Sequence, residues 1–411
     1  MSEAWIIDAC RTPRGIGKKG KGALAHLHPQ ALGASVLKAL AERNSLDTAD
    51  VDDIIFGTSW QRGAQGGDLA RMAALQAGYD VKSSAVTLDR FCGSGITAVN
   101  IAAASVMSGM EDLVVAGGCE MMSLHGSDTT QSPFMDNDNL ELREMHPQPH
   151  QGVCADAIAT LEGIDRESLD QLALSSQQRA AAAIEAGYFS RSLIAVHNPD
   201  GSVALDHEEF PRAGTTLEGL AGLKPAFAPI ADYPLDEAGT TYRKLVAQVY
   251  PDLDIQHVHH AGNSSGVVDG AASLLLASPA YAKAHGLKPR ARVVAMANMG
   301  DSPTLMLNAP VPAARKVLKK AGLTLDDIDL FEINEAFAVV AEKFIRDLDL
   351  DRDKVNVNGG AMALGHPIGG TGSVLIGTIL DELERRDQRY GLVTMCAAGG
   401  MAPAIIIERV S

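Results

Sequence analysis

AVTLDRFCGSGITAVNIAAASVM, residues 85–107, decides the fold. A partly β-branched apolar run is followed by a turn that carries Cys92, Gly93, Ser94 and Gly95, and then by an alanine-rich segment suited to a buried helix. This order predicts a strand, a tight turn and a helix. Because unpaired backbone N–H groups and the helix dipole at a helix N-terminus favour a thiolate, Cys92 is a candidate nucleophile. The alternative interpretation is a small cysteine buried in the core.

The composition is that of an ordinary globular protein, with 46% hydrophobic and 21% charged residues in a chain of 411. This length predicts two or three domains. The formal net charge of −16 argues against nucleic acid or an anionic membrane as partner, although a local basic patch can still bind an anionic small molecule. The five cysteines are widely spread, which indicates reduced thiols. No signal-peptide core or membrane-spanning run is recognisable, so we expect a cytoplasmic protein.

Strands and helices alternate along the first third of the chain. This alternation predicts a mainly parallel sheet with helices on its faces. The expected elements are strands at 5–9, 53–57 and 112–118, and helices at 29–43 and 68–77.

The middle of the chain has a different composition and lacks the regular alternation of strands and helices. Residues 123–151 predict loops, and residues 200–260 are irregular and rich in proline. Two helices are expected between them, at about 154–161 and 166–186. We interpret this part as an excursion inserted into the α/β body, which resumes at Ala261 with a small-residue helix and a strand.

The last third of the chain repeats the first. DDIDLF at 326–331 echoes DDIIF at 52–56, and LVTMCAAGG at 392–400 echoes LVVAGGC at 113–119. Residues 355–373 are expected to give a strand, a glycine turn with His366 and a helix, as the stretch around Cys92 does. Packing of the two halves face to face would bring Cys92 and His366 to a shared seam, with Cys396 at the end of a neighbouring strand.

These side chains suit the chemistry of a thioester. A cysteine and a histidine on opposed helix N-termini can form a thiolate–imidazole pair, and a second cysteine can move a proton at carbon. Cys92 would accept the acyl group, while a second site removes an α-proton. Asn334, which follows a strand, can hold a water beside the same carbonyl.

Five motifs in order give this chain its resemblance to the thiolases, the acetyl-CoA acyltransferases. They are CGSG at Cys92, AGNSSGVVDGA at Ala261, NEAF at Asn334, GHPIG at Gly365 and CAAGG at Cys396. The resemblance covers the chain from end to end.

The resemblance implies the thiolase fold. That fold is α/β, with two similar βαβαβαββ halves in a five-layered α-β-α-β-α arrangement and an inserted loop domain. The implied domains are an N-terminal half of residues 1–121 plus about 261–281, a loop domain of residues 122–260 for CoA binding and subunit contacts, and a C-terminal half of residues 282–411.

The resemblance also implies catalytic roles. Cys92 resembles the nucleophile that becomes acylated, and His366 resembles the base that activates it. Cys396 resembles the acid/base that moves a proton at the acetyl methyl group. His366 and a water held by Asn334 resemble one oxyanion hole, and the backbone N–H groups of Cys92 and Ala398 resemble the other. Donors of this kind contribute about 3 kcal/mol each to transition-state stabilisation.

The implied reaction is reversible Claisen condensation and thiolysis, in which acyl-CoA and acetyl-CoA give 3-oxoacyl-CoA and CoA. Acetoacetyl-CoA or a fatty 3-oxoacyl-CoA is the expected substrate. CoA is then a substrate, no cofactor is held permanently, no metal is needed, and the assembly is a homodimer or homotetramer. The implied binding residues are Arg212 at the phosphate or adenine of CoA, His150, Ser265, Ala336 and Phe337 along the pantetheine path, and Met306 at the acyl pocket. A solvated surface arginine and a plain core methionine are the alternatives for Arg212 and Met306.

Two other functions fit parts of this pattern. A ketosynthase-like condensing enzyme needs two histidines, or a histidine and an asparagine, opposite the cysteine, whereas Cys396 stands here. A non-catalytic lipid-binding member of the family would be expected to lose Cys92, His366 or Cys396, and all three are present.

The chain also departs from the family pattern. Arg90 replaces a common asparagine, and it would either lower the pKa of the nearby thiol or point away into a salt bridge. Leu307 and Ala309 replace glycines, which affects chain-length preference. The segment Ala228 to His260 is longer than expected and would cover the pocket or build a subunit contact.

Overall fold

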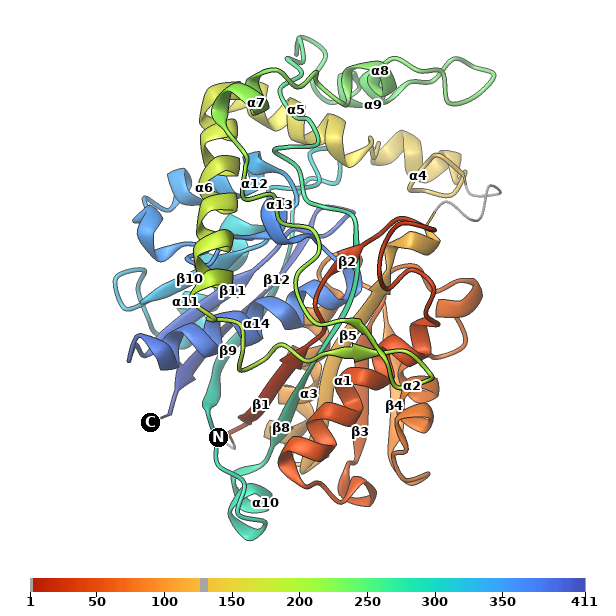
Figure 1. Cartoon of the computed structure of the whole chain (residues 1–411). Helices are drawn as coiled ribbons and strands as arrows, with labels where there is room; N and C mark the ends of the chain where they lie inside the picture. The colour runs from red at the N-terminus through yellow and green to blue at the C-terminus, as the bar shows by residue number, and fades with distance from the viewer. Residues whose placement is uncertain (1–2, 126–131, 411) are drawn as a thin grey trace.

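The structure is a computed structural model that describes residues 3–125 and 132–410. Within these residues, ten strands form one sheet in the order β10-β11-β12-β9-β1-β8-β5-β3-β4, with β2 paired to β8 (Figure 1). Its strands are β1 Trp5–Arg11, β2 Gly15–Ile16, β3 Asp53–Gly57, β4 Ser84–Leu88, β5 Leu113–Met121, β8 Val268–Ala277, β9 Ala291–Gly300, β10 Leu330–Ile333, β11 Tyr390–Thr394 and β12 Met401–Arg409. A small second sheet pairs β6 Val196–His197 with β7 Val203–Leu205.

The helices follow the sequence pattern closely in the first half of the chain. The long ones are α1 Pro29–Asn44, α2 Leu69–Ala77, α3 Ser94–Ser108, α5 Gln151–Leu161, α6 Arg166–Glu185, α11 Pro310–Ala321, α12 Ala338–Asp347 and α14 Ile368–Arg385. The short ones are α4 Leu140–Met145, α7 Leu217–Ala221, α8 Ala228–Ala231, α9 Tyr242–Ala247, α10 Pro279–Ala284 and α13 Ala361–Leu364, with 3₁₀ turns η1 Thr48–Asp50, η2 Gly63–Gln65, η3 Met122–Leu124 and η4 Arg352–Lys354.

The sheet is mixed, so the prediction of a mainly parallel sheet is wrong. β3 pairs in parallel with β4 and β5, and β10 pairs in parallel with β11. In contrast, β8 runs antiparallel to β1 and β5, and β12 runs antiparallel to β9 and β11. The reason for β12 is its short connection to β11, because only antiparallel strands can be joined by a tight turn.

The strand order shows the internal repeat. The order β3-β5-β8-β1 in one half corresponds to β10-β11-β12-β9 in the other, and the two halves have the same strand directions. The strand expected at Val355 is reduced to a single bridge with Phe331, which takes the place of β4. The halves join where Trp5 and Ile6 pair with β9.

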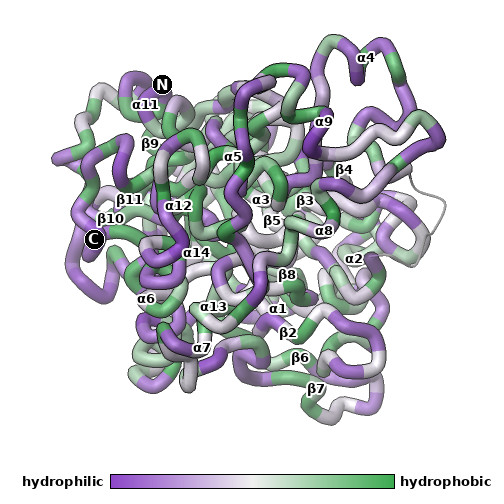
Figure 2. The backbone as a smooth tube through the Cα atoms, turned by 90° about the horizontal axis from the view of Figure 1, so that it is seen from above, coloured by the Kyte–Doolittle hydropathy of each residue, from purple (hydrophilic) through white to green (hydrophobic). Residues whose placement is uncertain are grey.

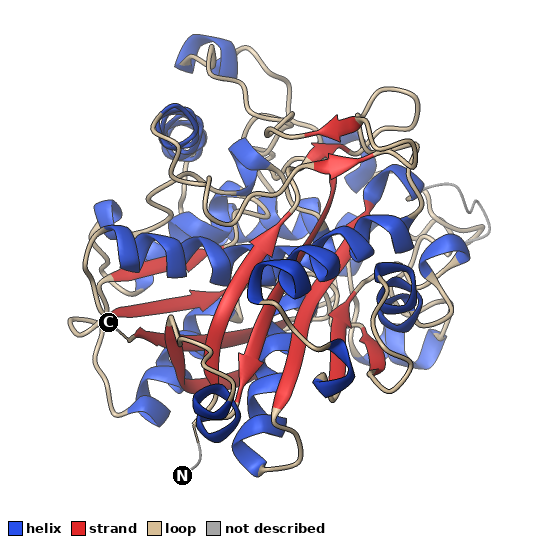
Figure 3. Cartoon of the chain, turned by 60° about the horizontal axis from the view of Figure 1, so that its bottom comes forward, coloured by secondary structure: helices blue, strands red, loops and turns tan. Residues whose placement is uncertain are grey.

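Helices and sheet halves form five layers, which confirms the expected arrangement. α1 and α2 pack on the outer face of the half that contains β3, β5 and β8, and α11 packs on the outer face of β9 and β12. α3 and α14 pack against each other and contact strands of both halves. Figure 3 shows helices on both faces of the twisted sheet.

Glycines allow the two central helices to approach each other. A Cβ at Gly372 of α14 would lie 2.2 Å from the backbone nitrogen of Ile96 in α3, and a Cβ at Gly95 would lie 2.8 Å from the backbone nitrogen of Ser373. Glycine is therefore required where the backbones touch. This contact fixes the distance between the two turns that precede these helices, at Cys92 and His366.

α3 is rich in small and apolar residues, as expected of a helix that is largely buried, and Ile101 is among its exposed residues. Its window Phe91–Ser108 is long and apolar enough to cross a membrane by length and composition, and it stands alone in this among the described residues. It is 67% buried inside the protein. The position between the two sheet halves accounts for this composition.

The inserted part differs from two expectations. Residues 123–151 are not all loop, because Asn139 caps the short helix α4 and η3 follows β5, while residues 126–131 lie outside the described residues. The stretch after Ala261 forms strand β8 without the expected helix. Figure 1 shows α4, α5, α8 and α9 above the sheet, and Figure 2 shows the same part of the chain from above.

Candidate active site

The turn that carries Cys92 is strained and tightly packed. Phe91 adopts a φ of 49°, a left-handed conformation that is uncommon for a bulky residue. Ser94 holds the turn, because its hydroxyl donates to the carbonyl of Phe91 at 2.6 Å. A Cβ at Gly93 would lie 2.8 Å from Pro403, so only glycine fits there. As a result, Cys92 sits at the N-terminus of α3 and is 8% exposed.

Burial controls the charge of this thiol. It raises the pKa of Cys92 well above the ordinary value, and the negative charge of Glu120 raises it further. The helix N-terminus favours the thiolate, but desolvation opposes it and is the largest influence on the pKa of this thiol. Arg90 is not among the larger influences on this thiol, and burial lowers its own pKa. Cys92 rests as a neutral thiol that must lose its proton when it reacts.

His366 is oriented as a base. Its Nδ1 lies 2.6 Å from the hydroxyl of Thr371, and that hydroxyl donates to the carbonyl of Pro367 at 3.0 Å. Because the Thr371 hydroxyl donates its proton to Pro367, we assign the Nδ1–H of His366 as the donor to the Thr371 oxygen. Nε2 of His366 then keeps its lone pair. Burial lowers the pKa of His366 to about 4, and the charge of Glu120 opposes this shift. The imidazole is neutral at pH 7 and can accept a proton at Nε2.

Asn334 lies beside this lone pair. Its Nδ2 is 3.5 Å from Nε2 of His366, and the side chain is 1% exposed. Its Oδ1 is buried and has no hydrogen-bond partner among the described residues. A buried amide oxygen without a partner is costly, so this position suits a water molecule or a ligand donor.

Cys396 follows β11 in the other half and is 1% exposed. Two backbone hydrogen bonds between Ala397 and Met401, at 2.7 and 3.1 Å, close a turn around it. Gly399 and Gly400 in this turn have φ values of 78° and 76°, which favour glycine. Burial raises the pKa of Cys396 to about 12, so it too is a neutral thiol that holds a proton.

Cys92 opens into a cavity of about 190 Å³. Three residues predicted for the site line it together with Cys92: His150, Met306 and Ala398. Met306 has a φ of 64°, so its backbone is strained where the side chain faces the cavity. The other lining residues are Ser59, Phe91, Pro133, Met135, Gln148, Pro149, Gln151, Tyr242 and Ile368.

Tyr242 was missed by the sequence interpretation. It belongs to α9, inside the unexpectedly long segment Ala228 to His260, and its hydroxyl donates to the carbonyl of Pro133 at 2.7 Å. Tyr242 and Pro133 therefore form one joined wall of the cavity. Of the two roles considered for the segment, covering the pocket is the one that these contacts support.

The residues expected along the CoA path lie in a connected row. The backbone N–H of Ser265 donates to the carbonyl of Ala336 at 2.9 Å. The ring of Phe337 packs at 5.6 Å from that of Phe227, which lies 5.7 Å from the ring of His150 at the cavity. Ser265, Ala336 and Phe337 line neither the Cys92 cavity nor the cavity that contains Arg212.

Arg212 lies in a separate cavity of about 290 Å³. Its backbone N–H donates to the side chain of Gln177 at 2.9 Å, and its guanidinium lies 5.8 Å from the ring of Phe210. The side chain is exposed. It can therefore meet a phosphate group without first breaking a buried ion pair.

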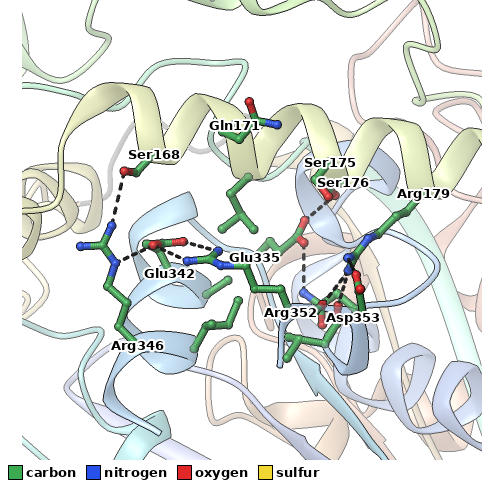
Figure 4. A pocket seen from close by; sticks show the side chains of 15 residues that line it. Ser168, Gln171, Ser175, Ser176, Arg179, Glu335, Glu342, Arg346, Arg352 and Asp353 are labelled. Carbon is green, nitrogen blue, oxygen red and sulfur yellow. Dashed lines mark hydrogen bonds and ion pairs between the residues drawn. The ribbon is translucent and has the colours of Figure 1, made fainter. Parts of the chain in front are cut away.

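A larger cavity, of about 390 Å³, lies between α6 and α12 and contains none of the predicted site residues. Figure 4 shows Arg346 and Arg352 converging on Glu342, and Glu335 pointing toward Ser176. Glu335 also accepts a hydrogen bond from Asn356 at 3.0 Å. These contacts anchor the residue next to Asn334.

The three histidines near Ala261 bind carboxylates within the chain. His257 and His259 both contact Asp156 at 2.7 Å, and His260 contacts Asp170 at 2.8 Å. Over residues 3–125 and 132–410, no group of three or more His, Cys, Asp or Glu side chains is arranged to hold a metal.

Comparison with known proteins gives full-length similarity. Residues 4–230 match the family described as thiolase, N-terminal domain, and residues 287–409 match thiolase, C-terminal domain. The chain is 40% identical to a steroid 3-ketoacyl-CoA thiolase of Mycobacterium tuberculosis over 100% of this chain and 95% of that protein. It is 40% identical to a beta-ketoadipyl-CoA thiolase of Acinetobacter baylyi over the whole of both chains. The crystal structure of the Bacillus anthracis acetyl-CoA acetyltransferase superposes with a TM-score of 0.82 at 35% identity, covering 100% of this chain and 99% of that one.

Proposed function

The chain belongs to the thiolase family, and on that premise we propose that it forms and cleaves 3-oxoacyl-CoA esters through an acyl group on Cys92. It is a CoA-dependent acyltransferase. The observation that carries the proposal is the placement of a neutral thiol, an imidazole lone pair and an unpartnered amide oxygen on turns of two packed halves.

In the proposed first half-reaction, Cys92 attacks the thioester carbonyl of an acyl-CoA. The S–H proton passes to Nε2 of His366, the C–S bond to CoA breaks, and the proton then passes to the sulfur of CoA. The backbone N–H groups of Cys92 and Ala398 are proposed to stabilise the oxyanion. In the second half-reaction, the thiolate of Cys396 takes a proton from the α-carbon of the second substrate, and His366 with the water of Asn334 stabilises the enolate oxygen. The α-carbon bonds to the acyl carbon, the C–S bond to Cys92 breaks, and the proton held by Cys396 passes to the Cys92 sulfur. Thiolysis is the reverse.

CoA is the proposed ligand of the two smaller cavities. Arg212 is proposed to contact its phosphate or adenine part, and the row from Ser265 and Ala336 through Phe337 to His150 is proposed to guide the pantetheine arm to Cys92. The cavity beside Cys92, with Met306, would take the acyl group. No cofactor beyond this substrate is proposed.

We further propose that the acyl group is uncharged. None of the described residues that line the Cys92 cavity is Arg or Lys, and burial lowers the pKa of His150, so it is neutral there. A carboxylate at the end of the acyl chain would have no partner in this cavity, and burying an unpaired charge is costly. Acetoacetyl-CoA and fatty 3-oxoacyl-CoA fit this condition.

The test is loss of 3-oxoacyl-CoA on addition of CoA, measured with acetoacetyl-CoA, a long-chain 3-oxoacyl-CoA and 3-oxoadipyl-CoA. We expect cleavage of the neutral substrates and a kcat/KM at least about a hundredfold lower for the acidic one. Activity restricted to acetoacetyl-CoA would indicate a short-chain acetyltransferase. Preference for 3-oxoadipyl-CoA would overturn the proposal of an uncharged acyl group.

Replacing Tyr242 with alanine is expected to shift this preference toward longer acyl chains. The ring forms a wall of the Cys92 cavity, so its removal should raise the kcat/KM ratio of long to short substrates by about tenfold. Tyr242→Phe is the matched control, because it keeps the ring and loses only the bond to Pro133. An unchanged ratio in the alanine variant would rule out this wall as a determinant of chain length.

We propose three domains for the chain: residues 1–121 with about 261–281, residues 122–260, and residues 282–411. A homodimer or homotetramer in the cytoplasm is proposed, supported by β4, which forms a sheet edge and exposes Val86.

A further inference from the structure

Glu120 is a buried carboxylate at the end of β5 that accepts six hydrogen bonds. Its Oε2 accepts from the backbone N–H of Ser59 at 2.8 Å and of Gly369 at 2.9 Å. The donors to Oε1 are Gln65 Nε2 at 2.8 Å, His125 Nε2 at 3.1 Å, the backbone N–H of Trp60 at 3.2 Å and the Thr58 hydroxyl at 3.4 Å.

These bonds join both sides of the catalytic seam. Gly369 lies in the first turn of α14, three residues after His366, and it comes from the C-terminal part of the chain. Ser59 lies in the loop after β3 and lines the Cys92 cavity. The seam is closely packed here, since a Cβ at Gly118 would lie 2.1 Å from the carbonyl oxygen of Gly369. A single carboxylate thus ties a cavity wall to the helix turn that carries the base.

The carboxylate is also charged. Burial alone would raise the pKa of Glu120, but hydrogen bonds from His125, Ser59 and Gln65 outweigh it and hold the pKa below its ordinary value. The resulting negative charge acts on both reacting groups, because it raises the pKa of Cys92 and of His366. It therefore opposes a thiolate and favours an imidazolium.

We propose that Glu120 is a positioning residue for acylation, which fixes the turn that carries His366 to the Ser59 wall of the Cys92 cavity and stabilises the imidazolium that forms on His366. The inference rests on the proposed function. The S–H bond of Cys92 breaks, its proton goes to Nε2 of His366, Sγ bonds to the acyl carbon, the C–S bond to CoA breaks, and the proton leaves Nε2 for the CoA sulfur. Glu120 touches neither substrate nor the transferred proton.

The experiment compares Glu120→Gln, which removes the charge, with Glu120→Asp, which keeps the charge on a shorter side chain. Single-turnover acylation of Cys92 is followed by quenching and mass spectrometry. We expect Glu120→Gln to acylate roughly tenfold more slowly or worse, with little change in KM, and Glu120→Asp to recover part of the rate. Alkylation of Cys92 by iodoacetamide at pH 8 should become faster in Glu120→Gln, because a charge that opposes the thiolate is gone.

Glu342→Gln is the matched control. Glu342 of α12 is also a buried carboxylate. It binds Arg346 and Arg352, and among the described residues it has no hydrogen bond or ion pair with the catalytic turns. The Glu342→Gln variant should therefore show wild-type rates of Cys92 acylation and of Cys92 alkylation. His125→Ala, which removes one donor from a half-exposed position, provides a variant that disturbs the core less, and it should slow acylation by a smaller factor in the same direction.

Several ionisable groups share this region, so the rates are measured above pH 7. Asp269, whose pKa burial raises to about 6, would otherwise contribute. The groups concerned are Asp89, Cys92, Cys119, His125, Asp269, His366 and Cys396.

Wild-type acylation rates in both Glu120→Gln and His125→Ala would overturn the inference. If wild-type protein itself forms no acyl-Cys92, the proposed function fails instead.

Discussion

Replacing Cys396 with alanine is expected to abolish condensation and thiolysis while leaving the acylation of Cys92 intact. Cys396 is a neutral, buried thiol, so it can donate the proton that the α-carbon gains in thiolysis, and its thiolate accepts the proton that the α-carbon loses in condensation. Removal of a positioned acid/base costs about two to four orders of magnitude in rate. Acylation does not require this proton transfer, so incubation with acetyl-CoA should still add one acetyl group to the variant.

The acetyl group is detected as a mass increase on the peptide that contains Cys92. Cys10→Ala is the control, since Cys10 belongs to a different core cluster from Cys92, and its thiol contacts the carbonyl of Val36 at 3.3 Å and the hydroxyl of Ser273 at 3.5 Å. Unchanged condensation by Cys396→Ala would contradict the mechanism. Loss of acylation in the same variant would show that Cys396 shapes the Cys92 cavity instead.

Much of the fold was predictable because its signals are local. The glycine turn after a β-branched run and the small residues of α3 lie within about twenty positions, and the repeat near Val355 shows the same pattern. The direction of β8 relative to its neighbours was not predictable. This strand follows the whole inserted part of the chain, and the local sequence near Val268 does not determine whether it pairs in parallel or antiparallel. The strand expected near Val355 is only a single bridge with Phe331 in the structure. The local sequence could not show this, because strand pairing depends on residues that are distant in the sequence.

The site was predictable to the extent that it depends on turns. Cys92, His366 and Cys396 follow glycine-rich motifs, whereas Tyr242 reaches the cavity only through the three-dimensional course of the inserted segment. Glu120 could have been suspected from its place after Gly117 and Gly118 at a strand end, but its six donors come from distant segments. The protonation state of Cys92 was not predictable from its turn, because the favourable effect of a helix N-terminus is local, whereas the desolvation that raises the pKa of this thiol depends on residues packed around it from distant segments.

Replacing His366 with alanine is expected to slow acylation of Cys92 by about a thousandfold and to change its pH dependence. In the wild type, the base is the neutral imidazole, whose pKa is about 4. The neutral form is complete above roughly pH 5 and is lost as pH falls through 4, so the acylation rate should be flat between pH 6 and 8. The unperturbed histidine value, near 6.5, would instead give a rise across this range.

Without His366, the thiol must ionise to solvent before it attacks. Burial holds the pKa of Cys92 well above its ordinary value, so the acylation rate of the variant should rise about tenfold for each pH unit with no plateau up to pH 9. Thr371→Val offers a milder comparison, because it removes the acceptor that fixes Nδ1–H while keeping the imidazole. A flat profile in the alanine variant would mean that another base takes the proton. A rise in the wild type between pH 6 and 8 would mean that His366 is far less desolvated than its 4% exposure requires.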